Sequence, residues 1–388
     1  MRRSTLSPRD GWRETVEDQG LTWHTTESGQ PYWDESAFWA FSEREIDRIE
    51  AATAELYDMV LEAVGRTVAD GRLHELGYDE QAAGLIETSW NRRTWEPTLY
   101  ARFDLAYDGR DLKMLELNGD TPTSLLEAAV VQWYWLQDRF PHLDQFNSIH
   151  EKLIDAFRLY AQSGGTRAPL HFASVQPHPE DEGTVGYMAA CAAEAGLQPV
   201  YVPIDDIGWV GDGADGGFVD ADDQPISALF KLYPWEWLLD DEFGERIARL
   251  TGAEKLTVME PAWKMAASNK ALLPVLWRMF PGHELLLPAT LNEAEARGWG
   301  DHVRKPVRGR EGANVTLVER GQVAAERGGA YDDDLFVYQQ RAALAQSGAG
   351  WAVLGSWVVN RTACGLGVRE SGSPITDNTA RFVPHVME

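Results

Sequence analysis

The sequence predicts a mixed α+β and α/β fold with a helical amino-terminal region, one β-α-β unit and an antiparallel carboxyl-terminal half. Changes in hydrophobic period support this prediction. Apolar residues recur at helical spacing up to about residue 90, alternate from residue 99, and form a strand–helix–strand pattern from residue 169. With 388 residues and 44% hydrophobic content, the chain is long enough for two or three packed lobes.

The first clear element is a helix over residues 42–68. Ser42 can cap its amino end, and Glu45 stands three residues later, which is the spacing of a capping box. The chain then changes period, because residues 99–107 and 112–118 alternate between apolar and polar side chains. A turn containing glycine separates these two segments, so they predict a β-hairpin.

The middle of the chain predicts a parallel pair of strands. A helix over residues 124–139 follows the hairpin. Apolar segments 170–175 and 199–203 then enclose a helical stretch over residues 183–195, which is the pattern of a β-α-β unit. Residues 208–223 are rich in Gly and Asp and predict an exposed turn or a short hairpin.

The carboxyl-terminal half predicts an antiparallel sheet with few helices. A helix is expected over residues 269–280, and the last segment, 363–383, carries several glycines and a turn near Asp377-Asn378. Strands are expected over residues 301–307, 315–319, 335–339 and 352–360, with a Gly-rich loop at 308–314.

Composition excludes several classes of protein. The net charge is −26, from 35 basic and 61 acidic residues, and no basic run suggests binding to nucleic acid or to an acidic membrane. The charge can serve solubility or attract a cationic substrate. The two cysteines are far apart, which argues against a disulfide framework or a structural zinc site. Without an apolar segment near Met1, or a run of eighteen apolar residues, we expect a cytoplasmic protein.

The hairpin carries the strongest chemical signal. Residues two apart on a strand face the same side, so Arg102 shares a face with Asp104, and Glu116 shares a face with Asn118. A connection of three or five residues places Asp104 opposite Glu116. Two carboxylates and an amide oxygen suit Mg²⁺, and the arginine can stabilise a transferring phosphoryl group. The alternative is a solvent-facing hairpin with charge pairs, although the polar loop 118–123 beside the cluster favours a site.

Two lysine-containing segments are further candidates. Lys305 ends a predicted strand directly before the Gly-rich loop, where it can contact phosphate while backbone N–H groups bind phosphate oxygens. The spacing is not that of a Walker A motif, and an ordinary β-turn is the alternative. Lys264 and Lys270 flank the start of the helix predicted at 269–280, where lysines often only extend to solvent. The sequence contains no G-x-S-x-G, H-E-x-x-H or strand-linked G-x-G-x-x-G motif, and its nine histidines are scattered.

These segments, in this order, resemble the glutathionylspermidine synthase family of ATP-grasp ligases. The resemblance extends from about residue 90 to the end. The matching stretches are RFDLAYDGRDLKMLELNGDTPTSLLEAAVVQWYW, FKLYPWEW, EPAWKMAASNKALLPVLWRMFPGHELLLPA, KPVRGREGANV, VYQQ, GSWVV, GLGVRE and FVPH. The resemblance implies an ATP-grasp fold with a helical amino-terminal region and a preATP-grasp-like β-α-β lobe, in one module. Its approximate lobes would be a helical and hairpin lobe at 1–168, the α/β lobe at 169–262, a lid at 263–335 and catalytic strands at 336–388.

The resemblance also implies roles for individual residues. Arg102 would contact phosphate, and Arg369 would lie over the acyl-phosphate centre. The Mg²⁺ ligands would be Asp104, Glu116 and Asn118. The lysines on the ATP phosphates would be Lys270 and Lys305. The loop covering the phosphates would be Gly309, Arg310, Glu311 and Gly312, and the hinge that reads adenine would be Val337, Tyr338, Gln339 and Gln340. The substrate contacts would come from Asp120, Thr121, Thr123, Glu180 and Asp181.

The implied activity is an ATP- and Mg²⁺-dependent carboxylate–amine ligase that forms an amide through an acyl phosphate. Its partners would be a small-molecule acid, such as a peptide, and an amine, such as a polyamine, and it would be a monomer or a homodimer. Two departures narrow this expectation. The amidase domain of bifunctional members is missing, so amidase activity should be absent. Leu232 follows Lys231 where authentic synthases carry a threonine, so the substrate stays open. Kinase-type phosphorylation on the same fold and a non-catalytic nucleotide-binding module are the alternatives.

Overall fold

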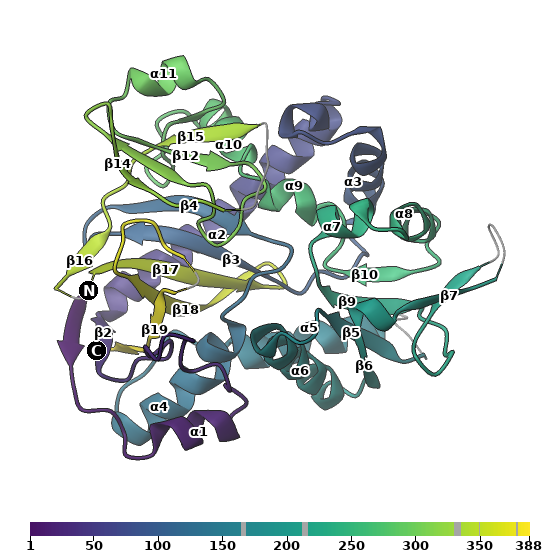
Figure 1. Cartoon of the computed structure of the whole chain (residues 1–388), viewed down its shortest axis with the longest axis horizontal. Coiled ribbons are helices and arrows are strands. Elements are labelled where there is room, and N and C mark those ends of the chain that lie inside the picture. The colour runs from purple at the N-terminus through teal and green to yellow at the C-terminus, as the bar shows by residue number, and fades with distance from the viewer. Residues whose placement is uncertain (164–167, 212–215, 330–334, 349, 378) are drawn as a thin grey trace.

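The protein was analysed as a computed structural model, which describes residues 1–163, 168–211, 216–329, 335–348, 350–377 and 379–388. The described residues form a mixed α/β architecture. Three sheets dominate it: an antiparallel sheet of six strands, an antiparallel sheet of five and a parallel sheet of four (Figure 1). The predicted combination of parallel and antiparallel parts is therefore confirmed.

The six-stranded sheet contains the predicted hairpin as β3 and β4. Its strand order is β19-β18-β17-β3-β4, and β16 also pairs with β17. The bounds are Tyr100–Tyr107 for β3, Leu112–Asn118 for β4, Ala345–Ser347 for β16, Gly350–Val359 for β17, Thr362–Ser371 for β18 and Arg381–Val383 for β19. The long helix α2, Glu43–Ala69, packs against β17 and β18. The predicted capping box is present, because Ser42 accepts from the Glu45 N–H while the Glu45 side chain accepts from the Ser42 N–H.

The four-stranded parallel sheet confirms the β-α-β unit. Its order is β10-β9-β5-β6, with β5 at Leu170–Ser174, β6 at Pro199–Pro203, β9 at Ala228–Leu232 and β10 at Thr257–Met259. The connecting helix α6, Pro179–Glu194, begins four residues before the predicted start, because Pro179 suits a first helical turn and His178 caps it. Beside it lies α5, Ile149–Gln162. The short hairpin predicted at 208–223 is present as β7, Gly208–Val210, and β8, Gly217–Val219, while residues 212–215 lie outside the described residues.

The five-stranded sheet lies beyond β4, which is the edge strand of the six-stranded sheet (Figure 1). Its order is β11-β15-β12-β13-β14, and every pairing in it is antiparallel, as predicted for this half. The bounds are Ala289–Thr290 for β11, His302–Pro306 for β12, Thr316–Glu319 for β13, Gln322–Glu326 for β14 and Phe336–Gln340 for β15. The short helix α11, Glu293–Arg297, follows β11. The predicted turn near Asp377 is tied by the Thr379 N–H, which donates to Asp377 Oδ1, and Asn378 lies outside the described residues.

Two predicted helices differ from the structure. The helix expected at 269–280 is instead two short helices, α9, Lys264–Ser268, and α10, Leu272–Met279. The Asn269 side chain accepts from the Ala271 N–H, a local bond that competes with helix continuation. The helix expected at 124–139 starts at residue 125 and contains a π-helical turn, Glu127–Val131, before α4, Gln132–Arg139.

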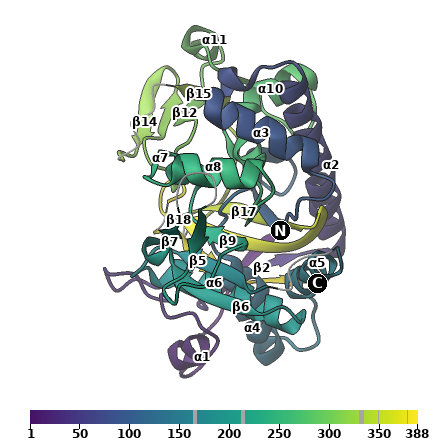
Figure 2. The ribbon, with the colours of Figure 1, turned by 90° about the vertical axis from the view of Figure 1, so that its right-hand side faces the viewer.

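The remaining elements bring the chain ends together and cover the edges. Strand β2, Ala37–Phe41, pairs with β1, Arg2–Thr5, and runs parallel to β20, His385–Met387. Figure 2 shows α3, Glu80–Arg92, beside α8, Gly244–Gly252, and the two helices are in contact. The other helices are α1, Trp12–Asp18, and α7, Trp235–Asp240, with short 3₁₀ turns η1, Leu73–Leu76, and η3, Ile204–Asp206. Among the described residues, no helix is both long and apolar enough to cross a membrane.

Large aromatic side chains fill the core. Trp33, Trp135, Trp235 and Trp357 are almost fully buried. Cys191 and Cys364 are buried and free, so the expectation that they form no disulfide is confirmed.

Candidate active site between the three sheets

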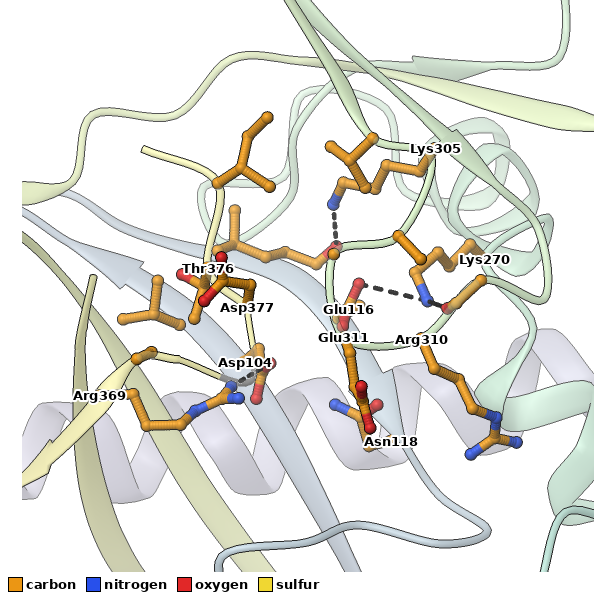
Figure 3. A pocket seen from close by; sticks show the side chains of 18 of the residues that line it. Asp104, Glu116, Asn118, Lys270, Lys305, Arg310, Glu311, Arg369, Thr376 and Asp377 are labelled. Carbon is orange, nitrogen blue, oxygen red and sulfur yellow. Dashed lines mark hydrogen bonds and ion pairs between the residues drawn. The ribbon is translucent and has the colours of Figure 1, made fainter. Parts of the chain in front are cut away.

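The main cavity, of about 740 Å³, opens where the three large sheets meet. Its wall contains side chains from β3, β4, β12, β15, β17 and β18, and from the loops after β5 and β9. Such a volume accommodates a ligand of nucleotide size together with a small second molecule. The residues predicted from the sequence to carry chemistry gather mostly in this wall (Figure 3).

The hairpin register brings the predicted ligands together. Arg102 pairs with Asn118 across the strands, and Asp104 pairs with Glu116. A register shift after Asp104 changes the pairing so that Leu105 lies opposite Met114. All four polar side chains line the cavity, and Figure 3 shows Glu116 and Asn118 next to Asp104. The structure therefore favours the site over a solvent-facing hairpin.

Two arginines hold the Asp104 carboxylate. Arg102 Nε donates to Oδ1 at 2.8 Å, and Arg369 donates to Oδ2 at 2.5 Å. Burial acts to raise the pKa of Asp104, but the two guanidinium groups outweigh it and lower the pKa to about 2. Arg102 also donates to the carbonyl oxygen of Thr123 at 2.5 Å, which joins the hairpin to the loop that follows it. Asp104 is therefore ionised throughout the physiological range.

Two lysines approach the hairpin from the other side. Lys270 Nζ lies 3.4 Å from Glu116 Oε2 and donates to the Gly309 carbonyl oxygen at 2.6 Å. Lys305 donates to Gln339 Oε1 at 2.9 Å. Burial opposes ionisation of Glu116, but Lys270 and Lys305 outweigh it, so the pKa of Glu116 is lowered. Four cations and two carboxylates thus line one end of the cavity, an arrangement suited to a polyanionic ligand with a cation.

The hairpin side chains fit a hard divalent cation. Asn118 Nδ2 is buried and has no hydrogen-bond partner among the described residues, so it can donate to a bound ligand. Arg369 Nε is likewise buried and unpartnered there, and as an N–H donor it suits a phosphate oxygen rather than the cation itself. Within the described part of the chain no group of three His, Cys, Asp or Glu side chains could hold a metal, so two carboxylates and one amide are what this site offers. Mg²⁺ ordinarily keeps several waters and phosphate oxygens beside one or two carboxylates.

The Gly-rich loop closes over the cavity and touches both walls. Arg310 donates to Thr121 Oγ1 at 2.5 Å and lies 3.8 Å from the Glu236 carboxylate. On the opposite side, Gly312 has a φ of +69°, and a Cβ built on it would lie 2.5 Å from the Thr376 carbonyl oxygen. Figure 3 shows Arg310 pointing away from Thr376 and Asp377. All four residues of the predicted loop, Gly309, Arg310, Glu311 and Gly312, line the cavity.

The predicted hinge lies only partly at the cavity. Gln339 and Gln340 line it, whereas Val337 and Tyr338 are buried in the five-stranded sheet, between β11 and β12, and do not. The cavity continues along the segment after β15, residues 341–344, and reaches Trp299. Sequence reasoning missed these residues, because a segment without periodicity gives no signal of its own. The residues that form this part of the wall therefore start at Gln339 and extend past the carboxyl end of the predicted hinge.

The predicted substrate residues separate into two groups. Thr121, Thr123, Glu180 and Asp181 line the cavity. Asp120 does not, because it is buried, accepts from Lys231 Nζ at 2.6 Å and accepts from the Trp235 N–H at 3.0 Å. Its placement supports a structural pair between the loop that follows β4 and strand β9, rather than contact with a substrate.

An acidic region was only partly visible in the sequence. Glu180 lies in the first turn of α6, and burial, followed by the charges of Glu127 and Asp181, raises its pKa to about 8. Burial also raises the pKa of Asp181, to about 6. Glu127, which accepts from Tyr32 Oη at 2.7 Å, was missed, although a carboxylate within an apolar helical segment is a usable signal. This end of the cavity favours a cationic ligand.

Comparisons with known proteins agree with this architecture. The family described as glutathionylspermidine synthase preATP-grasp matches residues 3–388. A Haemophilus influenzae protein, provisionally named an acid–amine ligase, is 43% identical over 367 residues, which cover 92% of this chain and 91% of that protein. Trypanothione synthetase of Crithidia fasciculata is 28% identical over 84% of this chain and 53% of its own length. The bifunctional glutathionylspermidine synthetase/amidase of Escherichia coli is 25% identical over 74% of this chain and 49% of its own length.

A solved structure shows the same fold at low identity. A glutathione synthetase-like effector from Globodera pallida, in its apo form, superimposes with a TM-score of 0.57 at 9% identity and covers 99% of this chain and 98% of that one. The chain spans about half of the two longer synthetases and nearly all of the Haemophilus protein. The chain belongs to the glutathionylspermidine synthase preATP-grasp family.

Proposed function

We propose that the protein is a carboxylate–amine ligase with an ATP-grasp fold that uses ATP and Mg²⁺ to form an amide. One observation carries the proposal: two ionised carboxylates and four cations line one cavity, and Glu180 and Asp181 make another part of its wall acidic. Membership of a family whose named members include acid–amine ligases and synthetases supports the same reaction class.

Each group at the polyanion end has a distinct task in this proposal. Asp104, Glu116 and Asn118 would hold Mg²⁺, which supplies charge neutralisation for phosphate oxygens when bound. Lys270 and Lys305 would contact the nucleotide phosphates. The Gly-rich loop would cover the phosphates, and Gln339 and Gln340 would lie at the adenine base of the nucleotide. Catalysis then consists mainly of positioning and electrostatic stabilisation.

The reaction would proceed in two balanced steps. A substrate carboxylate oxygen forms a bond to the γ-phosphorus of ATP while the bond to ADP breaks, which yields an acyl phosphate. The amine nitrogen then bonds to the acyl carbon, inorganic phosphate leaves, and the nitrogen loses a proton. Arg102 and Arg369 lie at the Asp104 carboxylate, where they would stabilise the charge on the transferring group.

The acidic end would select the amine. Glu180 and Asp181 line the cavity within the first turn of α6, and Thr121 and Thr123 line it from the loop that follows β4. Ammonium groups bind favourably near such carboxylates. The names of the related synthetases make glutathione and spermidine the first acid and amine to test.

The test is a screen of acids and amines for ADP release that requires both, followed by mass spectrometry of the product. Asp104→Ala and Glu116→Ala should each reduce turnover by at least about 10³-fold, because each removes a ligand charge from the transition state. Asp108→Ala is the matched control, since its carboxylate lies in the exposed turn of the same hairpin and accepts from the Arg110 and Asp111 N–H groups. A phosphorylated product without an amide would contradict the ligase proposal, and full activity of either ligand variant would contradict the metal assignment.

A further inference from the structure

A buried ion pair lies at the open end of the hairpin. Lys264 Nζ, on α9, is 3.0 Å from Glu260 Oε2, and the two side chains are 1% and 0% exposed. Neither residue lines the cavity. A lysine in an apolar helical segment ordinarily extends its ammonium group to solvent, so a fully buried one needs other compensation. Burial alone would lower the pKa of Lys264, but the Glu260 carboxylate outweighs it, so the pKa is raised and the lysine stays charged.

The pair is bonded to the backbone at the beginning of β3. Glu260 Oε1 accepts from the Leu99 N–H at 2.8 Å and from the Tyr100 N–H at 3.1 Å. Glu260 Oε2 accepts from the Thr98 hydroxyl at 2.7 Å. Lys264 Nζ donates to the Tyr100 carbonyl oxygen at 2.9 Å. Both backbone polar groups of Tyr100 are therefore held by this one pair of side chains.

The same lysine holds the end of β4. Lys264 Nζ donates to the Gly119 carbonyl oxygen at 3.2 Å, and the Gly119 N–H donates to Ser268 Oγ at 2.9 Å. Ser268 in turn donates to the Lys264 carbonyl oxygen at 2.9 Å. A Cβ at Gly119 would lie 3.1 Å from Ser268 Oγ and 3.5 Å from Lys264 Cδ, so the glycine sits directly against α9. Both backbone groups of this residue are thus fixed from one helix.

The backbones of Tyr100 and Gly119, which these side chains hold, lie next to the residues proposed to bind phosphate and metal. Arg102 is two residues beyond Tyr100 on β3. Asn118 is the last residue of β4 and directly precedes Gly119. Arg102 and Asn118 are also partners in the strand register. A shift of the backbone at Tyr100 or Gly119 would therefore move the phosphate-contacting arginine and the amide ligand together.

We propose that Glu260 and Lys264, with Ser268, are positioning residues for the nucleotide–metal site, acting through the backbones of Tyr100 and Gly119. The proposal rests on the function assigned above to Arg102, Glu116 and Asn118. A purely structural role would lower the stability of the protein without changing how the folded protein binds nucleotide. Binding measured well below the unfolding temperature separates the two roles.

The experiment measures binding of the non-hydrolysable analogue β,γ-imido-ATP with Mg²⁺ by isothermal titration calorimetry, so that no acid or amine is needed. The first variant is Glu260→Gln with Lys264→Met, which removes both charges together and leaves no unpaired buried ion. The second is Ser268→Ala, which frees the Gly119 N–H without touching the ion pair. We expect the dissociation constant to rise about tenfold in the first and about threefold in the second.

Glu35→Gln is the matched control, because Glu35 is fully buried and pairs with Arg9 at 2.6 Å, outside the cavity wall. It should lower the melting temperature and leave the dissociation constant unchanged. Circular dichroism identifies which variants fold, and a wild-type dissociation constant in either folded positioning variant overturns the proposal.

Glu116→Gln in the same titration separates this proposal from the one on which it rests. Weakened binding in Glu116→Gln with unchanged binding in the positioning variants rejects the positioning role alone. Unchanged binding in Glu116→Gln as well rejects the ligand assignment, and the positioning role falls with it.

Discussion

Glu180 is a cavity residue whose charge depends on its surroundings. It is half-buried at the start of α6, where Glu127, Asp181 and Glu311 add negative charge and the Thr123 hydroxyl favours ionisation only weakly. Its pKa of about 8 compares with an ordinary 4.5. Between these values the unfolded chain releases a proton that the folded protein keeps, so this carboxyl lowers stability progressively as pH rises from about 4.5 to 8.

Replacing this carboxyl should separate stability from substrate binding. Glu180→Gln removes the penalty, so the melting temperature at pH 8 should rise by roughly 1–3 °C relative to the wild type, with no gain at pH 4.5. The same variant should raise the KM of the amine at least about tenfold, because the charge that meets the ammonium group is lost. Thermal scans at both pH values and steady-state kinetics at pH 8 provide the measurement.

Glu80→Gln is the control for this residue, because Glu80 occupies the first turn of α3 in an exposed position. It shares the helix-terminal placement of Glu180 without its burial. An equal pH-dependent gain in melting temperature in Glu80→Gln would show that the effect comes from the helix end. An unchanged amine KM in Glu180→Gln would contradict the proposed amine subsite.

At the level of elements, the Gly-rich loop depends on one close approach. Gly312 has a left-handed backbone and lies against Thr376, while Ile375 packs with Val315 and Leu317 in a small apolar cluster. Asp377 also pairs with Arg327. The segment after β18 is thus a second cover that meets the loop above the hairpin (Figure 3).

Gly312→Ala should therefore impair closure more than folding. The added Cβ would lie 2.5 Å from the Thr376 carbonyl oxygen, so loop and segment must separate. We expect kcat to fall about tenfold or more, because a closed loop excludes water and completes the site. Gly321→Ala is the control: it has a similar φ, +75°, in the β13–β14 turn, and nothing lies within 4 Å of its added Cβ. Equal losses of kcat in both variants would attribute the effect to backbone strain alone.

The elements also show which local patterns can be interpreted from the sequence. The pairing of Asp104 with Glu116 was predicted from a connection of three or five residues, and the structure has the pairing but not that connection. Four residues, 108–111, separate Tyr107 from Leu112, and the register shift after Asp104 produces the pairing, which strand period alone does not predict. The break between α9 and α10 was not predicted, because apolar spacing continues across Asn269 while its side chain bonds locally to Ala271. The strand β9 was missed as well, since a buried lysine interrupts its short apolar run and only the distant Asp120 explains that burial.

At the scale of the whole molecule, the site exists only because three sheets meet. The hairpin supplies Glu116, the five-stranded sheet supplies Lys305, and the β-α-β unit supplies Glu180. Local periodicity predicts each sheet, but not which edges face one another. The effect of the Glu127 charge on Glu180, or the pairing of β2 with β20, depends on packing between segments far apart in the sequence. The resemblance to a family supplied the roles that pattern alone could not.

A ligand that joins these sheets should stabilise the entire chain. A nucleotide that binds only the folded state, at about 100 times its dissociation constant, contributes about 2.7 kcal/mol. We expect β,γ-imido-ATP with Mg²⁺ to raise the melting temperature by roughly 3–6 °C.

Removal of the divalent cation with EDTA should abolish this shift, because the ionised Asp104 and Glu116 would then repel the phosphates. Glu116→Ala should likewise lose most of the shift even with Mg²⁺ present, since it loses a metal ligand while Lys270 and Lys305 stay in place. A full shift in EDTA would show that the phosphates are held by the cationic side chains alone.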